Sequence, residues 1–229
     1  MCAKAVALAA RPEGMPKTSD FQIVDIESND PADGEIQVKN ICMSVDPYMR
    51  GRMVDRKSYV PPFQIGEPLT GGAIGKVTKS AHPDFKEGDF VSSHWGWRDG
   101  FTARAEGIER LGEIVAPASE YLGAIGMPGM TAYAGLLEVG ALKDGETVFV
   151  SGAAGAVGSI VGQIAKLKNC HVIGSAGNDE KVELLTKELG FDSAFNYNDG
   201  DLLGHLRELA PEGIDVYFDN VGAEHLEAA

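Results

Sequence analysis

Short apolar runs separated by turn-forming residues dominate the first half of the chain. The runs are rich in Val, Ile and Phe, and Gly, Pro and Asp lie between them. This pattern is typical of strands that are joined by tight turns. Asp-Gly or Glu-Gly pairs at 33–34, 87–88 and 99–100 favour such turns. We therefore expect a compact barrel or curled sheet, with strands at residues 5–10, 21–26, 35–45, 72–79, 89–97 and 101–105.

From about residue 117 onward, helical and strand patterns alternate. A strand at 148–151 precedes a helix with Val157, Ile160, Val161 and Ile164 on one face. Further strands are predicted at 171–174, 194–195 and 214–219, and further helices at 119–125, 131–139, 180–189 and 202–209, with an interruption at 127–129. Such alternation implies right-handed crossovers and a doubly wound parallel sheet, which makes this an α/β protein.

The predicted parallel sheet has about four strands, whereas a doubly wound sheet usually has about six. Residues 224–229 have the pattern of a helix start, and the chain ends there. We therefore expect this half to be C-terminally incomplete, and the chain alone to be unstable or inactive.

Charge and cysteine content exclude several classes of partner. The formal net charge of −14 disfavours binding to nucleic acid or to an anionic membrane. No apolar run approaches membrane-spanning length, and the run at 5–10 is too short for a signal peptide. Cys2, Cys42 and Cys170 are too few and too scattered for a disulfide framework or a zinc knuckle. We expect a cytoplasmic protein that binds neither nucleic acid nor membranes.

A glycine-rich turn separates the strand at 148–151 from the helix that follows it. Gly152, Gly155 and Gly158 are three residues apart, a different spacing from G-x-G-x-x-G. The same tasks are available to them: a tight turn, close approach to a phosphate, and close packing of the helix. The positive end of the helix dipole favours a pyrophosphate at this point. The turn therefore predicts a dinucleotide site, and the alternative is a purely structural turn.

The second parallel strand indicates which dinucleotide binds. An NAD site usually carries an acid about 20 residues beyond the turn, where it holds the ribose 2′-OH. Residues 174–178 contain no acid, and Lys181 follows within one helical turn. A cation there suits the 2′-phosphate of NADP(H), although a solvated surface lysine is the alternative. We therefore expect NADP(H) rather than NAD(H).

Several motifs together resemble those of a known family. They include Ala-Ala-Gly-Ala-Val-Gly at 153–158, Gly-Asn-Asp-Glu-Lys at 177–181 and Tyr-Phe-Asp-Asn-Val-Gly at 217–222. The first half agrees through Ser-Val-Asp-Pro-Tyr-Met-Arg at 44–50 and Met-Pro-Gly-Met-Thr-Ala-Tyr at 127–133. The chain resembles the zinc-independent medium-chain dehydrogenases/reductases, near the leukotriene B4 dehydrogenase, prostaglandin reductase and curcumin reductase branch.

This resemblance implies the domain organisation. A GroES-like β-barrel domain at residues 1–120 would bind the substrate. A Rossmann NADP-binding domain at residues 121–229 would be truncated relative to the family, whose members continue past position 229. Members of this family often dimerise through the edge of the Rossmann sheet, so we expect a homodimer of the full-length protein.

The resemblance also implies site residues. It places Lys181 and Tyr197 at the 2′-phosphate, Thr131 at the nicotinamide end, and Tyr48 in the substrate cleft. Asn220 would lie near the cofactor, at the end of the fourth strand. The expected NADP(H)-binding residues are Thr131, Gly152, Ala154, Gly155, Ala156, Val157, Gly158, Ser175, Gly177, Lys181, Tyr197 and Asn220.

Zinc ligands of the wider superfamily are missing from this sequence. Ser44 and Asp46 stand where a cysteine ligand would be matched, and Gly-Glu-Pro at 66–68 lacks the histidine of Gly-His-Glu. We expect no metal.

Without a Lewis acid, a conjugated enone is a more suitable hydride acceptor than an isolated carbonyl. Hydride would add at the β-carbon, and Tyr48, the cofactor ribose or water would supply the hydrogen bond or proton.

We therefore expect an NADPH-dependent reductase of the C=C bond of small-molecule enones or enals. One alternative is an NADPH quinone oxidoreductase, and another is a protein that binds NADPH without turnover. For Tyr48, structural packing after Pro47 is as plausible as catalysis. Arg50 and Arg52 have two open roles, contact with cofactor phosphate or exposure to solvent.

Overall fold

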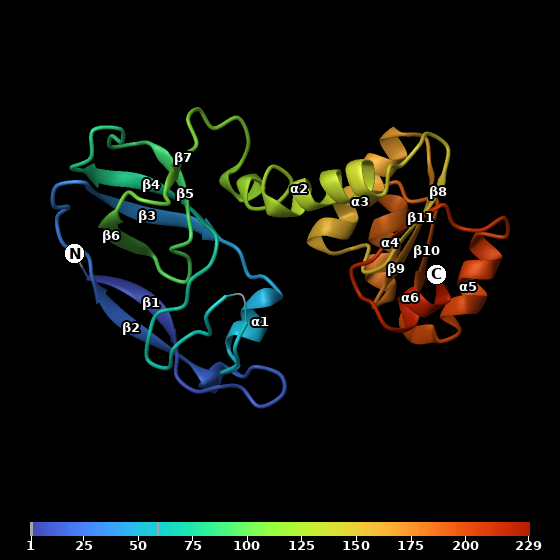
Figure 1. Ribbon diagram of the computed structural model, residues 1–229, viewed down its shortest axis with the longest axis horizontal. Helices are drawn as coiled ribbons and strands as arrows, with labels where there is room; N and C mark the ends of the chain where they lie inside the picture. The colour runs from blue at the N-terminus through green and yellow to red at the C-terminus, as the bar shows by residue number, and fades with distance from the viewer. Residues whose placement is uncertain (1, 59) are drawn as a thin grey trace. The chain divides into compact units, whose positions relative to one another are not determined.

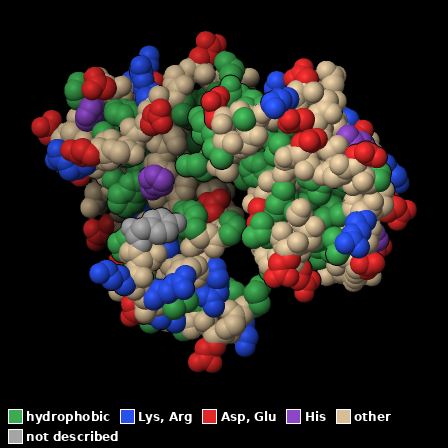
Figure 2. Space-filling model, turned by 45° about the vertical axis from the view of Figure 1, so that its right-hand side comes forward, with side chains coloured by type: hydrophobic (Ala, Val, Ile, Leu, Met, Phe, Trp, Pro, Cys, Tyr) green, Lys and Arg blue, Asp and Glu red, His purple; other side chains and the backbone are tan. Residues whose placement is uncertain are grey.

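The computed structural model describes residues 2–58 and 60–229 and contains two compact units, Met1–Leu122 and Gly123–Ala229 (Figure 1). Each unit has its own sheets and its own buried apolar clusters. Acidic side chains are scattered over both units on the face shown in Figure 2, in keeping with the net charge. Among the described residues, no helix has the length and apolar character needed to cross a membrane.

Antiparallel strands build the first unit. One sheet pairs β1 with β2, and a five-stranded sheet has the order β6-β3-β4-β5-β7. The backbone N–H of Val6 donates to Trp97 O (2.8 Å) and that of Asp99 to Lys4 O (3.0 Å), so β1 also bonds to the segment before β6. The elements are β1 (Cys2–Leu8), β2 (Phe21–Glu27), β3 (Glu35–Met43), α1 (Tyr48–Arg52), β4 (Ala73–Ser80), β5 (Phe90–Ser93), β6 (Gly100–Arg104) and β7 (Glu109–Arg110), with 3-10 turns at Thr18–Asp20 and Ala118–Tyr121.

Two apolar clusters fill this unit. One lies within the five-stranded sheet and includes Ile36, Val77 and Phe101. The other packs beneath α1 and consists of the buried residues Leu8, Met49, Met53, Phe63 and Leu69. Aromatic stacking extends both clusters, because Trp97 stacks on Phe21 (centroids 6.4 Å apart) and Trp95 on Phe101 (5.4 Å).

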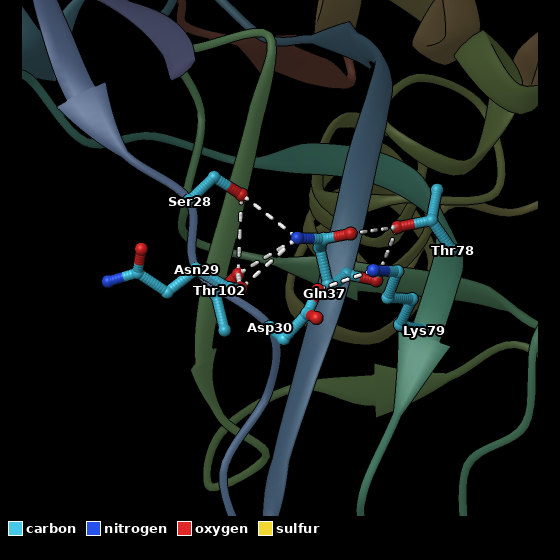
Figure 3. Close-up of polar contacts among 7 residues, drawn as sticks. All are labelled: Ser28, Asn29, Asp30, Gln37, Thr78, Lys79 and Thr102. Atoms are coloured by element: carbon cyan, nitrogen blue, oxygen red, sulfur yellow. Dashed lines mark hydrogen bonds and ion pairs between the residues drawn. The ribbon is translucent and has the colours of Figure 1, made fainter. Parts of the chain in front are cut away.

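A buried side-chain amide on β3 links neighbouring segments of the five-stranded sheet (Figure 3). Gln37 on β3 is 6% exposed. Its Nε2 donates to Asn29 O (3.2 Å) and lies 3.3 Å from Ser28 Oγ, while Thr78 Oγ1 donates to its Oε1 (3.1 Å). Because a buried amide without partners is costly, these bonds fix the segment at 28–30 to strands β3 and β4.

A parallel sheet of order β10-β9-β8-β11 forms the second unit. Its strands are β8 (Thr147–Val150), β9 (His171–Ala176), β10 (Ser193–Asn196) and β11 (Val216–Phe218). The helical segments are α2 (Met127–Tyr133), the π-helix Ala134–Val139, α3 (Ala156–Leu167), α4 (Asp179–Lys187), the 3-10 turn Tyr197–Asp199, α5 (Leu202–Leu209) and α6 (Glu224–Ala228).

Alternate residues of the parallel strands face two different cores. Val148 and Val172 belong to a cluster with residues of α2, α3 and α4. Phe149 and Ile173 belong to a second cluster that includes Leu206 of α5. The sheet is therefore covered by helices on both faces, as a doubly wound sheet requires. Together with the antiparallel first unit, this arrangement confirms the predicted fold class.

Three sequence-based boundaries are wrong. The expected helix at 119–125 is replaced by the short 3-10 turn Ala118–Tyr121. The expected interruption at 127–129 is the start of α2, because Pro128 lies in the first turn, where its missing N–H needs no partner. The strand expected at 89–97 ends at Ser93, and Trp97 has φ of +59°, which is incompatible with extended backbone.

Candidate functional site

The glycine-rich turn after β8 has the conformation that its sequence suggests. Gly152 has φ of +56°, a left-handed conformation that favours glycine. A Cβ at Gly158 would lie 2.7 Å from Gly152 O and 2.8 Å from Ala153 Cα, so the first turn of α3 touches the backbone of the loop. Among the described residues, no side chain caps α3, and Gly155 and Ala156 at its start are exposed. The N–H groups in the first turn of α3, a helix of twelve residues, are therefore available to bind an anion.

A second group of predicted residues lies where β9 and β10 end. Ser175 is fully buried, and its Oγ is without a hydrogen-bond partner in the part of the chain that the structure describes. A Cβ at Gly177 would lie 2.7 Å from the hydroxyl of Tyr197, so these two residues are in contact. Lys181 is exposed in the first turn of α4, and its backbone N–H bonds to Asn178 Oδ1 (2.9 Å). The ends of β9 and β10 therefore bring a hydroxyl, a phenol and a cation to the same end of the sheet.

The loop after β11 lies against the glycine-rich turn. A Cβ at Gly152 would lie 3.3 Å from Val221 Cγ2 and 3.5 Å from Asn220 Cβ. The backbone N–H of Asn220 donates to Ser151 Oγ (2.9 Å), and Asn220 Nδ2 donates to Ser151 O (2.9 Å). The fourth strand thus brings Asn220 to the turn, although the two segments are about 70 residues apart in sequence.

Asp219 and Tyr217 have shifted pKa values in this loop. Burial acts to raise the pKa of Asp219, but hydrogen bonds from Tyr217, Gly222 and Val221 overcome it and lower the pKa to about 2. Burial and the Asp219 carboxylate raise the pKa of Tyr217 to about 12, against an opposing hydrogen bond with Ser151. Asp219 is therefore ionised and Tyr217 is protonated at neutral pH.

The lowered pKa of Asp219 makes the loop sensitive to acid. Because the pKa in the folded state lies below the unfolded value of about 3.9, the ionised carboxylate stabilises the fold above about pH 4. That stabilisation is lost as the pH falls from about 4 towards 2. We expect the free energy of unfolding of Asp219→Asn to lie below that of the unaltered chain at pH 6. The gap should narrow at pH 2.5, as measured by urea titration, and an equal gap at both pH values would contradict this.

Tyr48 lies in the first unit, at the start of α1. It is 41% exposed and lines a cavity of about 390 Å³ together with Arg52 and Arg56. Arg50 and Arg52, whose roles the sequence leaves open, both bond to backbone carbonyl oxygens. Arg50 Nη2 donates to Gly14 O (2.7 Å), and Arg52 Nε donates to Pro61 O (3.0 Å), so both guanidinium groups hold local structure.

Thr131 is exposed on α2, and α2 packs against α3. The structure thus brings Gly152, Gly158 and Asn220 together, and separately Gly177 with Tyr197. Sequence reasoning missed Ser151 and Asp219, which link the two loops. The placement of Asp219 at the end of the strand predicted at 214–219 is a signal that identifies it. Within residues 2–58 and 60–229, no group of three or more His, Cys, Asp or Glu side chains is placed to hold a metal ion.

Comparison with known protein families assigns both halves of the chain. A family model described as the N-terminal domain of oxidoreductase matches residues 4–111. Another, described as zinc-binding dehydrogenase, matches residues 156–229.

Individual relatives are similar over nearly the whole chain. The NADPH-dependent curcumin reductase of Escherichia coli (strain K12) is 42% identical, across 96% of this chain and 64% of that protein. The NADP(+)-dependent 2-alkenal reductase of Nicotiana tabacum is 47% identical, across 98% of this chain and 67% of that protein. The crystal structure of CurA from Vibrio vulnificus in complex with NADPH superimposes with a TM-score of 0.92, at 42% identity over 98% of this chain and 67% of that chain.

This chain spans about two thirds of the length of these relatives. The resemblance of its sequence motifs is confirmed by both kinds of comparison. The chain belongs to the zinc-independent branch of the medium-chain dehydrogenase/reductase family.

Proposed function

We propose that this chain carries the substrate-binding and cofactor-binding parts of an NADPH-dependent reductase of α,β-unsaturated ketones and aldehydes. The GroES-like domain at residues 1–120 would bind the substrate, and the Rossmann domain at 121–229 would bind NADP(H). The glycine-rich turn at the start of α3 carries the proposal, because Gly158 touches backbone on the loop side and leaves the helix N–H groups open. The names of the relatives, an NADPH-dependent and an NADP(+)-dependent reductase, support the same cofactor.

The residues of the second unit fit NADPH in three respects. The open turn at 152–158 suits a pyrophosphate. Ser175 Oγ is buried and has no hydrogen-bond partner among residues 2–58 and 60–229, so a ligand could provide one. The exposed Lys181 suits a 2′-phosphate. The proposed binding residues are Thr131, Gly152, Ala154, Gly155, Ala156, Val157, Gly158, Ser175, Gly177, Lys181, Tyr197 and Asn220.

NADPH, when bound, supplies a hydride to the β-carbon of the substrate. Negative charge then develops on the conjugated carbonyl oxygen, where a hydrogen-bond donor stabilises it. We assign this donation to the hydroxyl of Tyr48, which lines the 390 Å³ cavity. The same hydroxyl, or water, would deliver the proton to the α-carbon.

The test is an NADPH oxidation screen of the full-length protein with enones, enals and quinones. We expect enone and enal reduction, and we expect Tyr48→Phe to lower kcat by about 100-fold, a typical contribution of one positioned acid. Tyr121→Phe is the matched control, since Tyr121 is in the same unit and its hydroxyl accepts the N–H of Val115 (3.1 Å).

Other outcomes of the screen decide between the alternatives. Enone turnover that is unchanged in Tyr48→Phe would remove the donor role of this residue. Reduction of quinones alone would identify a quinone oxidoreductase, and NADPH binding without turnover of any acceptor would identify a binding protein.

We further propose that the full-length protein is a cytoplasmic homodimer. Cys42 and Cys170 are free thiols, which supports a reducing compartment. The family resemblance supports the dimer, and the molar mass of the full-length protein in solution tests it.

A further inference from the structure

A single carboxylate oxygen organises the loop after β11. Asp219 Oδ1 accepts hydrogen bonds from the backbone N–H groups of Gly222 (2.7 Å) and Val221 (2.9 Å). It also accepts from the hydroxyl groups of Tyr217 (2.7 Å) and Ser151 (3.1 Å). The donors come from β11, from its loop and from the residue that follows β8. One oxygen therefore joins two segments of the chain.

The same contacts orient Asn220. Ser151 is fully buried, and its Oγ and its carbonyl oxygen accept from the backbone N–H and from Nδ2 of Asn220. With Nδ2 engaged in this way, Oδ1 of Asn220 is left as an acceptor at the edge of the glycine-rich turn. The position of Ser151 Oγ depends in turn on its bond to Asp219.

The identity of residue 219 is unexpected on electrostatic grounds. A site for an anionic dinucleotide is a poor place for a carboxylate, and this chain already has a net charge of −14. Four donors converging on one oxygen account for it, because hydrogen bonds to an ionised acceptor are about twice as strong as neutral ones. The low pKa of Asp219 agrees with an acceptor that stays ionised.

We propose that Asp219 is a positioning residue for NADPH: it fixes the loop at 219–222 against the glycine-rich turn and thereby sets where Asn220 and that turn meet the cofactor. The inference rests on the proposed function. The sheet order β10-β9-β8-β11 makes it specific, because Asp219 lies on the opposite side of β8 from Ser175, Gly177 and Lys181. Asp219 therefore acts on the part of NADPH bound at β8 and β11, and the adenosine 2′-phosphate end is independent of it.

The test compares two ligands on matched variants of the full-length protein. NADPH spans both ends of the site, whereas adenosine 2′-monophosphate, which lacks the 5′-phosphate, occupies the adenosine end alone. We expect Asp219→Asn to raise the Kd of NADPH about tenfold, the equivalent of about 1.4 kcal/mol. The Kd of adenosine 2′-monophosphate should stay within about twofold, a change of about 0.4 kcal/mol.

Asp215→Asn is the matched control. Asp215 precedes the same strand, and its Oδ2 accepts the backbone N–H of Thr147 (2.8 Å) at the other end of β8. Asp215→Asn weakens one backbone hydrogen bond at the end of the sheet away from the glycine-rich turn. Melting temperatures should therefore fall in both variants, whereas NADPH affinity should fall only in Asp219→Asn. Tyr217→Phe, which keeps the carboxylate and removes one donor, should give a smaller loss of NADPH affinity and serves if Asp219→Asn does not fold.

Each remaining result overturns a stated claim. If the unaltered chain binds neither ligand, the proposed function fails and the positioning role fails with it. If the chain binds NADPH and Asp219→Asn binds it equally well, the positioning role alone is wrong. Equal weakening of both ligands would make Asp219 a general support of the unit, which also overturns a specific role at β8 and β11.

Discussion

Replacing Gly158 with alanine is expected to weaken NADPH binding by more than about 100-fold, or about 2.7 kcal/mol. The added Cβ would meet only backbone atoms, Gly152 O at 2.7 Å, Ala153 Cα at 2.8 Å and Ala153 O at 3.0 Å, among its three nearest contacts. Backbone atoms cannot move aside by a change of rotamer, so α3 must shift away from the turn. That shift displaces the N–H groups that the phosphates require. Isothermal titration with NADPH measures the loss.

Gly162→Ala is the control for this experiment, because it makes the same substitution one helical turn further along α3. Its Cβ would come within 2.0 Å of Phe191 Cζ in the buried core. Overpacking of this kind costs about 1–3 kcal/mol of stability. We expect a lower melting temperature with nearly unchanged NADPH affinity in the folded protein. NADPH affinity that falls equally in both variants would show that Gly158 acts through stability alone.

Lys181→Ala is expected to reduce the preference for NADPH over NADH by about 10-fold to 100-fold, the value of one to two charge-assisted hydrogen bonds. The ammonium group is the cation nearest in sequence to the acid-free end of β9, and only NADPH carries the 2′-phosphate. The Kd of NADH should therefore stay unchanged. Titration of the unaltered protein and of Lys181→Ala with NADPH and with NADH gives the ratio of the two Kd values directly.

Lys187→Ala provides the matched control, since Lys187 lies in the last turn of the same helix and is paired with Glu183 (2.9 Å). It should alter neither Kd. Equal affinity of the unaltered chain for NADPH and NADH would remove the argument for the 2′-phosphate altogether.

Periodicity was sufficient to predict most of the strands and helices, because each half buries its apolar residues in a regular way. Apolar residues alternate along a strand of a half-buried sheet and recur every three or four positions along α3, because in each element one face is buried. Local backbone chemistry was harder to predict. Pro128 suggested an interruption, yet proline is equally suited to the first turn of a helix, and sequence pattern alone does not distinguish these roles.

The candidate site was predictable where a residue acts through its own conformation or charge. Gly152 is of this kind, because its φ of +56° confirms the predicted tight turn, whereas the role of Lys181 stays a prediction. Asp219 is different, because its importance depends on four donors, one of which, Ser151, is 68 residues away. Arg50 is a second case in which sequence alone is insufficient. Its charge is compatible with contact to phosphate or to solvent, and the fold places its guanidinium against the carbonyl oxygen of Gly14. Long-range hydrogen bonding leaves no periodic trace in a sequence.

Trp95 and Trp97 lie in the first unit, where each stacks on a phenylalanine, and this placement has a spectroscopic consequence. The chain has two tryptophans, and both precede residue 123, so the emission of indole reports on one unit alone. Unfolding of the parallel sheet is then observed through backbone circular dichroism and through Tyr133, Tyr197 and Tyr217. Chains with more than one domain need not unfold in a single step. Denaturation curves recorded at the two signals can therefore separate. The indole curve then measures the first unit alone, and a change in circular dichroism without a change in indole emission belongs to the second unit.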